Sequence, residues 1–203
     1  MNVYDFDKTI FDGDTEDRFF EFLFEKTGWV VDKWIYKICE FMFRHNLIDK
    51  TPCRETQYSV LRKIDNLDEL LEEYWDSHEK FLMKWYINGA KDPTDVIATG
   101  SPRFLMEPIA KRLGVAGLVA TEMDRKTGKI TEGKFAIQQY KLENFLKQYK
   151  PEDVDKFYSD AFTDHYMAEI AKEAYAVHDG EQITEWNTYF AKEIAKEQAK
   201  AAK

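Results

Sequence analysis

Residues 1–14 read Met-Asn-Val-Tyr-Asp-Phe-Asp-Lys-Thr-Ile-Phe-Asp-Gly-Asp, and the rest of the chain is organised around this stretch. A short apolar run, residues 3–6, carries one acid at Asp5 and is followed by a second at Asp7. In an extended segment, residues two apart point to the same side, so both carboxylates can face one site. Burying an unpaired carboxylate is costly, and coordination to a metal ion is one of the few remedies. The stretch therefore indicates an oxygen-rich site suited to Mg²⁺, in which a carboxylate can also attack phosphorus.

The same two acids have a simpler interpretation. Asp-x-Asp pairs also flank solvated surface turns, and residues 1–14 alone do not separate the two interpretations. The remaining chain must supply the partners of a phosphate or metal site.

Composition limits the class of protein. The chain has 203 residues, of which 44% are hydrophobic and 15% aromatic, so it can form one domain or a core domain with an insertion. Its formal net charge is −9, from 29 basic and 38 acidic residues, and no basic stripe is present. We therefore expect no nucleic-acid partner, because nucleic-acid binding depends on neutralising phosphates.

The compartment is inferred from what the sequence lacks. There is no run of about 18 apolar residues, so we expect no membrane span. Residues 1–14 have acids where an export signal would have basic and apolar residues. Cys39 and Cys53 lack the spacing of a metal or redox motif, and we interpret them as reduced thiols in a cytoplasmic protein.

Residues 15–90 show a helical and unusually aromatic pattern. Four helices are expected, over residues 15–28, 29–42, 51–64 and 67–87. Consecutive helices without strands usually pack as their own bundle. We interpret the aromatic faces as the core of that bundle, part of which can roof a site.

From residue 92 onward, strands and helices alternate. The predicted strands cover residues 96–98, 118–120, 154–158 and 175–177, with helices between them, one of which is expected over residues 136–149. This alternation predicts a parallel sheet, to which residues 1–13 add one strand. The expected fold is α/β: a Rossmann-like parallel sheet with helices on both faces, plus an all-helical cap inserted after the first strand. The core domain would comprise residues 1–14 and 91–203, and the cap residues 15–90.

Polar residues follow three of the predicted strands. Asp5 and Asp7 follow the first, residues 99–101 the second, and Asp160 with Asp164 the strand at 154–158. In open parallel sheets, ligands bind beyond the carboxyl ends of the strands. A hydroxyl with backbone amides at a helix start can hold an anion, so Thr99 and Gly100 are candidates for phosphate binding. Thr99 can also simply cap the following helix.

Four motifs in a fixed order carry a family resemblance. They are Asp5-Phe-Asp7-Lys-Thr9, Ile97-Ala-Thr99-Gly-Ser-Pro, Lys141 at the start of Lys-Leu-Glu-Asn-Phe-Leu, and Ser159-Asp160-Ala-Phe-Thr-Asp164. Together they resemble the haloacid dehalogenase superfamily, in its phosphoserine-phosphatase-like group with a helical cap. The resemblance covers about residues 1–14 and 95–180.

The resemblance implies a Mg²⁺-dependent phosphatase acting on a small phosphorylated metabolite. Asp5 would form an aspartyl-phosphate and Asp7 would act as acid and then base. Thr99, Gly100 and Lys141 would hold the phosphoryl oxygens. The metal ligands implied by the family are Asp5, the main-chain carbonyl of Asp7, Asp160 and, directly or through water, Asp164.

Substrate choice is less determined. Phosphoserine phosphatases have a glutamate nine residues after the nucleophile, where this chain has the shorter Asp14. Arg54 and Arg62 are two alternatives for a cap arginine, and Lys134 is a second candidate for the motif lysine. No oligomeric state is predicted.

Other functions compete with phosphatase activity. A phosphotransferase would use the same intermediate with another hydroxyl as acceptor, and a non-catalytic protein could bind a phosphorylated ligand. Residues 128–134 match most of a nucleotide-binding P-loop, but Phe135 stands where Ser or Thr must bind Mg²⁺.

Overall fold

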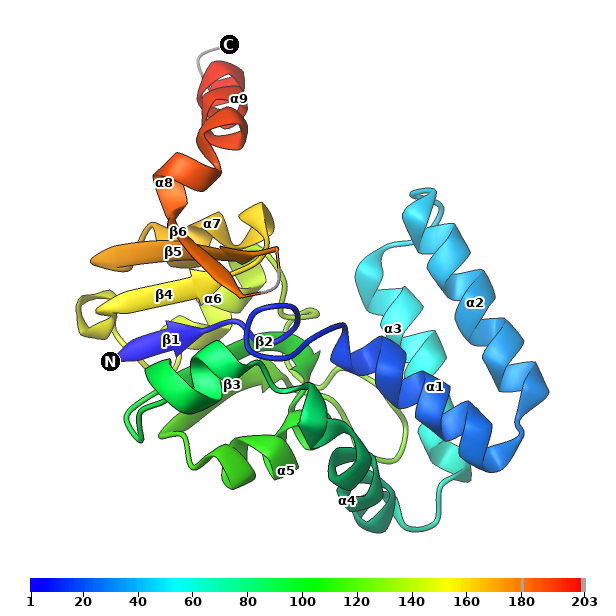
Figure 1. Cartoon of the computed structure of the whole chain (residues 1–203). Coiled ribbons are helices and arrows are strands. Elements are labelled where there is room, and N and C mark those ends of the chain that lie inside the picture. Colours follow the sequence, from blue (N-terminus) through cyan, green and yellow to red (C-terminus); the bar gives the residue numbers. More distant parts are fainter. Residues whose placement is uncertain (180, 202–203) are drawn as a thin grey trace.

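A six-stranded sheet forms the centre of the protein. The computed structural model describes residues 1–179 and 181–201. The strand order is β3-β2-β1-β4-β5-β6 (Figure 1). The strands are β1 Asn2–Tyr4, β2 Val96–Pro102, β3 Gly117–Thr121, β4 Lys156–Ser159, β5 Glu173–His178 and β6 Gln182–Glu185. Neighbouring strands are parallel except β5 and β6, which are antiparallel. The predicted α/β, Rossmann-like fold is confirmed.

The sheet buries side chains on both faces. Val3 of β1 lies level with Val96 of β2 and Phe157 of β4, and all three belong to one hydrophobic cluster. The next residue, Tyr4, points to the opposite face and belongs to a second cluster. Because successive side chains alternate between faces, this register explains why the strands read as short, continuous apolar runs.

Helices flank the sheet and fill the insertion between β1 and β2. The insertion contains α1 Thr15–Thr27, α2 Val30–Arg44, α3 Lys50–Tyr58 and α4 Leu67–His78. The later helices are α5 Arg103–Leu113, α6 Gln139–Leu146, α7 His165–Ala168, α8 Trp186–Tyr189 and α9 Ala191–Ala201. β1 runs towards the helices of the insertion, and α2 and α3 stand away from the sheet (Figure 1). No helix in residues 1–179 or 181–201 is long and apolar enough to cross a bilayer.

The fourth predicted helix is too long. α4 ends at His78, and the chain then pairs with the loop after β1: the Asp12 amide donates to the Phe81 carbonyl at 2.8 Å, and the Met83 amide donates to the Ile10 carbonyl at 2.9 Å. These long-range bonds replace the helical bonds that the apolar spacing predicted.

The end of the sheet also differs from the prediction. The strand at residues 175–177 is not the last one, because β6 adds an antiparallel strand at the edge. Its sequence, Gln-Ile-Thr-Glu, is too short and polar to stand out as a strand. The helix predicted over residues 136–149 is confined to α6, Gln139–Leu146.

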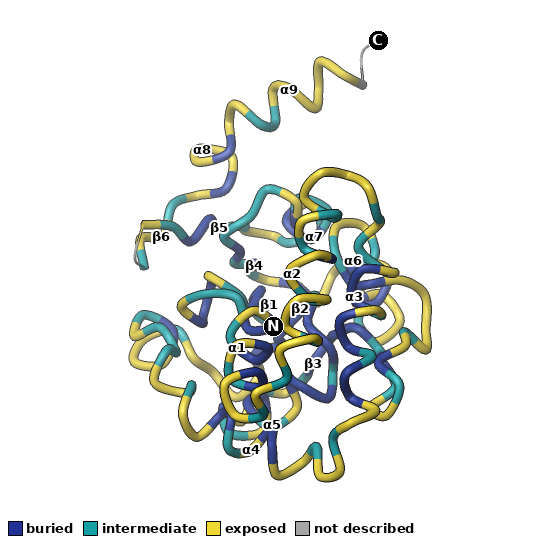
Figure 2. Tube along the Cα trace, turned by 90° about the vertical axis from the view of Figure 1, so that its right-hand side faces the viewer, coloured by how far each residue is buried: buried dark blue, intermediate teal, exposed yellow. Residues whose placement is uncertain are grey.

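The interpretation of all the aromatic helix faces as core is wrong for α2. Cys39 of α2 is buried, whereas Val31, Trp34 and Phe41 are 70%, 60% and 59% exposed. Much of α2 appears as exposed chain when this side is turned to the viewer (Figure 2). Both Cys39 and Cys53 are free thiols, as expected.

α4 connects the insertion to the sheet layer. The fully buried Trp75 packs its ring against Phe6 and Phe11, and its indole N–H donates to the Leu105 carbonyl of α5 at 2.7 Å. The apolar core is therefore continuous from the sheet into α4. The boundaries 1–14, 15–90 and 91–203 as separate domains stay a prediction.

Replacing Trp75 tests this connection. Trp75→Ala is expected to lower the free energy of unfolding by about 3–5 kcal/mol, because it leaves a large cavity and an unpaired carbonyl. Trp34→Ala, at an exposed position, is the matched control and should change it by less than about 0.5 kcal/mol. Urea unfolding measures both, and equal losses would contradict the assignment of Trp75 to the shared core.

Candidate active site

The centre of the sheet positions Asp5 and Asp7. β1 lies between β2 and β4: the chain first forms β2 and β3 on one side of β1, and then crosses to the other side to form β4, β5 and β6. Such a switch point creates a crevice beyond the strand ends. Asp5 follows β1 directly, its amide donates to the Tyr158 carbonyl at 2.9 Å, and the residue is only 7% exposed.

Lys141 joins two of the predicted acids. Its ammonium donates to Asp5 Oδ1 at 2.7 Å and to Asp164 Oδ2 at 2.6 Å. The lysine is 4% exposed, and the Ser159 hydroxyl also donates to Asp164 Oδ2, at 2.8 Å. Lys141 of α6 thus links Asp5, which follows β1, to Asp164, which also accepts a hydrogen bond from Ser159 at the end of β4.

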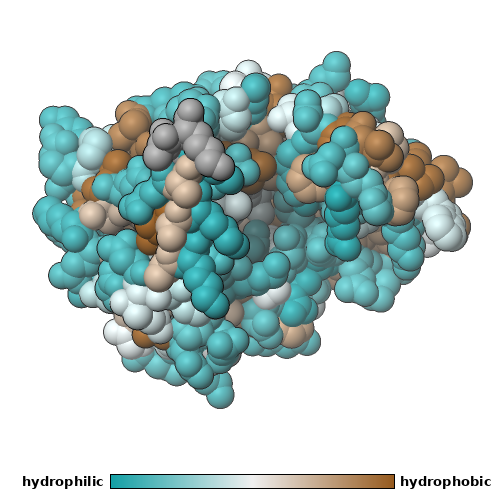
Figure 3. All heavy atoms as spheres, turned by 90° about the horizontal axis from the view of Figure 1, so that it is seen from above, coloured by the Kyte–Doolittle hydropathy of each residue, from teal (hydrophilic) through white to brown (hydrophobic). Residues whose placement is uncertain are grey.

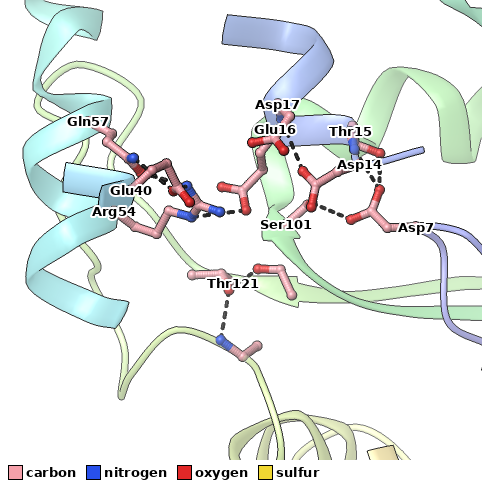
Figure 4. A network of polar contacts seen from close by, with 12 residues as sticks. Asp7, Asp14, Thr15, Glu16, Asp17, Glu40, Arg54, Gln57, Ser101 and Thr121 are labelled. Atoms are coloured by element: carbon pink, nitrogen blue, oxygen red, sulfur yellow. Dashed lines mark hydrogen bonds and ion pairs between the residues drawn. The ribbon is translucent and has the colours of Figure 1, made fainter. Parts of the chain in front are cut away.

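Asp7 is held from another side, by the start of α1 and the end of β2. The Thr15 amide donates to Asp7 Oδ1 at 2.7 Å, and the Thr15 hydroxyl donates to the same oxygen. The Ser101 hydroxyl lies 3.3 Å from Oδ2 (Figure 4). Asp14 caps α1 by accepting from the Asp17 amide at 3.0 Å.

Asp160 approaches through its backbone. Its amide donates to the Thr9 hydroxyl oxygen at 3.0 Å, and that hydroxyl lies 3.5 Å from Asp5 Oδ2. Asp5, Asp7, Asp160, Asp164 and Lys141 all line one cleft of about 210 Å³. The structure therefore brings these predicted residues together.

The cleft holds more negative than positive charge. Burial, and then the nearby Asp164 and Asp160, raise the pKa of Asp5 to about 7 although Lys141 opposes the shift. Burial and the neighbouring Asp14 and Asp5 raise the pKa of Asp7 well above its usual range. Burial likewise raises the pKa of Asp160 to about 6, against the effect of Lys8.

This donor set fits a divalent cation. Uncompensated carboxylate oxygens around a cleft are the ligands that Mg²⁺ prefers, and the ion usually takes one or two carboxylates and keeps several waters. Within the described residues no group of three or more His, Cys, Asp or Glu side chains is already arranged as a metal cage. The residues therefore fit a sparsely ligated, hydrated ion rather than an all-protein site.

The segment after β2 supplies the opposite wall. Gly100 and Ser101 line the cleft, whereas Thr99 is fully buried and its hydroxyl oxygen accepts from the Ser101 amide at 3.1 Å. A Cβ on Gly100 would lie 3.1 Å from Ile137 Cγ2 and 3.3 Å from the Ala136 carbonyl oxygen, so a larger residue would displace this wall.

Residues of the helical insertion reach the same cleft. Arg54 of α3 is 2% exposed and pairs with Glu16 at 3.3 Å and with Glu40 at 2.6 Å (Figure 4). Arg54, Glu16 and Lys50 line the cleft, whereas Arg62 is exposed and does not. The sequence left Arg54 and Arg62 as alternatives and missed Glu16 and Lys50, because helix packing alone places them here.

Two other candidates lie elsewhere. Lys134 is exposed and donates to the Tyr140 hydroxyl at 2.7 Å, outside the lining of the cleft. The P-loop-like residues 128–134 precede a buried Phe135, and α6 begins only at Gln139, so the strand-loop-helix context of a P-loop is missing.

Comparison with known families agrees with this arrangement. The model of the haloacid dehalogenase-like hydrolase family matches residues 3–169. The chain belongs to this family. No curated protein matches this haloacid dehalogenase-like hydrolase significantly.

Solved structures share its fold. A protein of unknown function from Bordetella pertussis Tohama I has a TM-score of 0.76 at 18% identity, over 87% of this chain and 89% of its own. A phosphoserine phosphohydrolase-like protein from Francisella tularensis has a TM-score of 0.55 at 15% identity, covering 88% of each chain. A probable phosphoserine phosphatase from Vibrio cholerae has a TM-score of 0.66 at 15% identity, over 94% of this hydrolase and 58% of its own chain. At these identities the similarity is one of fold.

The raised pKa of Asp5 predicts a pH-dependent stability. Between its ordinary pKa of 3.8 and about 7, the folded hydrolase keeps a proton that the unfolded chain releases. The Asp5 contribution to the free energy of unfolding therefore falls as pH rises through that window. Removing the Asp5 charge carries a pH-independent cost, because Lys141 loses one of its two carboxylate partners. In EDTA, the free energy of unfolding of Asp5→Asn relative to wild type should therefore rise with pH, by on the order of 2 kcal/mol across this window.

Urea unfolding across that pH window, with EDTA present, measures this difference. Asp68→Asn, which removes an exposed carboxylate, is the matched control and should follow the wild type. A difference between Asp5→Asn and wild type that is constant with pH would contradict the predicted raised pKa of Asp5.

Proposed function

We propose that this hydrolase is a phosphatase that cleaves small phosphomonoesters through a phospho-aspartate on Asp5. The observation that supports this most directly is the Lys141 ammonium, held between Asp5 and Asp164 beside a cleft that also opens onto Asp7. Phosphoryl transfer requires in-line positioning and neutralisation of charge, and this grouping offers both.

In the first step, an Asp5 oxygen attacks phosphorus and the bond from phosphorus to the ester oxygen breaks. Lys141 keeps Asp5 oriented and stands ready to bind a phosphoryl oxygen, together with the Gly100 amide and, as the family resemblance implies, the Thr99 hydroxyl. The two carboxylates raise the pKa of Lys141 above its ordinary value although burial opposes them, so it stays an ammonium.

Asp7 supplies the proton. Its raised pKa favours the protonated form, so it can donate a proton to the departing ester oxygen. The resulting carboxylate then takes a proton from water, which attacks phosphorus and releases phosphate and Asp5. Thr15 fixes Asp7 Oδ1 throughout, which fixes the orientation of the carboxyl group.

Mg²⁺ would be held by Asp5, the Asp7 main-chain carbonyl and Asp160, with support from Asp164. When bound, it would neutralise charge between these acids and the phosphate. The small cleft and its side chains Lys50, Arg54 and Glu16 favour a small, charged phosphorylated metabolite. Asp14 borders the cleft but already caps α1. A role in specificity would therefore require its carboxylate to bind the substrate and the Asp17 amide at the same time.

Phosphate release from a panel of small phosphomonoesters tests the proposal. We expect turnover with Mg²⁺, none with EDTA, and a loss on the order of 1,000-fold or more in Asp5→Asn, because the nucleophile is removed. Asp68→Asn should retain wild-type turnover. Full activity in Asp5→Asn would reject the phospho-aspartate mechanism.

The same assay separates the alternatives. A phosphotransferase would release product faster when candidate alcohols are added, with the phosphoryl group recovered on the alcohol. A binding protein would show no turnover of any ester.

Asp7→Asn is expected to show how the acid acts. For an alkyl phosphate, the loss should be roughly 100- to 10,000-fold, because the leaving alkoxide needs a proton. For p-nitrophenyl phosphate, whose leaving group needs no proton, the first step should survive and phospho-enzyme should accumulate. Rapid-quench measurement of the nitrophenol burst detects this, and equal slowing of both substrates would contradict the assigned role of Asp7.

A further inference from the structure

α2 exposes a continuous apolar stripe. Val31, Trp34, Ile35, Ile38 and Phe41 recur at helical spacing on one side of α2, and we refer to these five residues as the outer face. Val30 and Leu47, at its two ends, are 63% and 66% exposed. Apolar atoms gather at the end of the molecule where α2 lies (Figure 3).

The outer face is a contiguous apolar patch, unlike the single exposed hydrophobic residues of an ordinary protein surface. With Val30 and Leu47, its side chains are 39–70% exposed, and they include Trp34 and Phe41. Trp34 and Phe41 are 60% and 59% exposed, so at about 150–250 Å² for each aromatic side chain they together expose roughly 180–300 Å², and the five aliphatic side chains add to this area. The largest patch of a typical monomer is about 300–600 Å² and is often functional.

Charge is segregated across α2. Asp32 and Glu40 turn inward, where they pair with Lys63 at 2.8 Å and Arg54 at 2.6 Å, and their side chains are only 13% and 16% exposed. The basic side chains remain outside: Lys33, Lys37 and Arg44 are all exposed.

Lys37 lies beside the apolar stripe itself. Its Nζ is 5.6 Å from the Trp34 ring centroid. The side of α2 that faces solvent therefore combines an apolar stripe with basic residues, while both acids of the helix are paired on its inner side.

The charge of this region is opposite to that of the chain. On α2, Val30–Arg44, the basic Lys33, Lys37 and Arg44 are exposed and both acids are paired inward, so the side of α2 that faces solvent is positive within a chain whose net charge is −9. A second copy placed by two-fold symmetry would set this positive region against itself. A negatively charged, partly apolar surface matches the outer face better.

We propose that the outer face of α2 binds the surface of an anionic lipid bilayer, with the helix lying in the interface. Trp34, Ile38 and Phe41 would enter the boundary between headgroups and acyl chains, and Lys33, Lys37 and Arg44 would contact the headgroups. The inference is independent of the phosphatase proposal, because none of these residues lines the catalytic cleft.

Co-sedimentation with vesicles tests this inference. The probe is phosphatidylcholine alone or mixed in equal parts with phosphatidylglycerol, at low and high salt. We expect binding to the mixed vesicles, weakened by salt, and little binding to phosphatidylcholine alone. Trp34→Asp should reduce the partition coefficient about tenfold or more, because it places a charge on the apolar stripe.

Matched variants separate the contribution of the apolar stripe from that of the basic residues. Leu146→Asp charges a 44% exposed leucine on α6 and should bind like wild type. The pair Lys33→Gln and Lys37→Gln should lose roughly fivefold for each lysine removed. The pair Lys192→Gln and Lys196→Gln, with the same spacing on the exposed surface of α9, should retain binding.

A spectroscopic readout locates the contact. Mixed vesicles should shift the tryptophan emission of the wild type to shorter wavelength, because Trp34 leaves water. Trp34→Phe should retain binding while losing most of that shift. A shift of full size in Trp34→Phe would overturn the assignment.

Two results would reject the proposal. One is the absence of binding to mixed vesicles at low salt. The other is a wild-type dimer by light scattering that Trp34→Asp converts to a monomer, which would make a second copy the occupant of the outer face.

Discussion

The ion pairs of Lys141 are the interaction on which the site depends. A buried ammonium joins the carboxylate after β1 to the carboxylate of the loop after β4, so one side chain of α6 connects the segments that follow two neighbouring strands. Removing one partner of a buried pair is far costlier than the pair is stabilising, because it leaves the other charge uncompensated. Even with Lys141 in place, burial and like charge raise the pKa of Asp5 and Asp160, and that unbalanced charge is the reason for inferring a cation here.

Asp5 and Asp7 have different hydrogen-bond partners. Asp5 accepts from the Lys141 ammonium, whereas Asp7 faces the start of α1, where the Thr15 amide and hydroxyl both donate to one carboxylate oxygen. Two acids separated by a single residue thereby have different surroundings, and the proposed roles of Asp5 as nucleophile and Asp7 as acid rest on that difference. Ser101, from the end of β2, adds to the Asp7 side and connects it to the wall formed by Gly100.

The sequence predicted the sheet and most of the site because their signals are local. Buried parallel strands read as apolar runs, and polar residues directly after Tyr4, Ala98 and Ser159 must meet at one edge. The edge strand β6 was missed because its four residues have no apolar run, and the end of α4 was misplaced because bonds to residues 10–12 are made by backbone groups.

Apolar spacing also fails to distinguish a helix face that enters the core from one that faces solvent, as α2 demonstrates. Arg54 and Glu16 could not be assigned to the cleft for a related reason: their approach depends on how α1 and α3 pack, which no short motif encodes.

Both ends of the helical insertion are attached to the loop that carries the acids. The chain enters the insertion at Thr15, which holds Asp7, and leaves it at residues 81–83, whose backbone pairs with Ile10 and Asp12. Trp85 adds a bond from its indole N–H to the Thr9 carbonyl at 2.9 Å. Both ends of the insertion are thus bonded to residues 7–12, which carry Asp7. A rigid rotation of the helices of the insertion against the sheet would therefore displace the backbone between Asp7 and Thr15. A ligand that fills the cleft between Arg54, on the insertion, and Lys141, on α6, would contact both sides of that attachment at once.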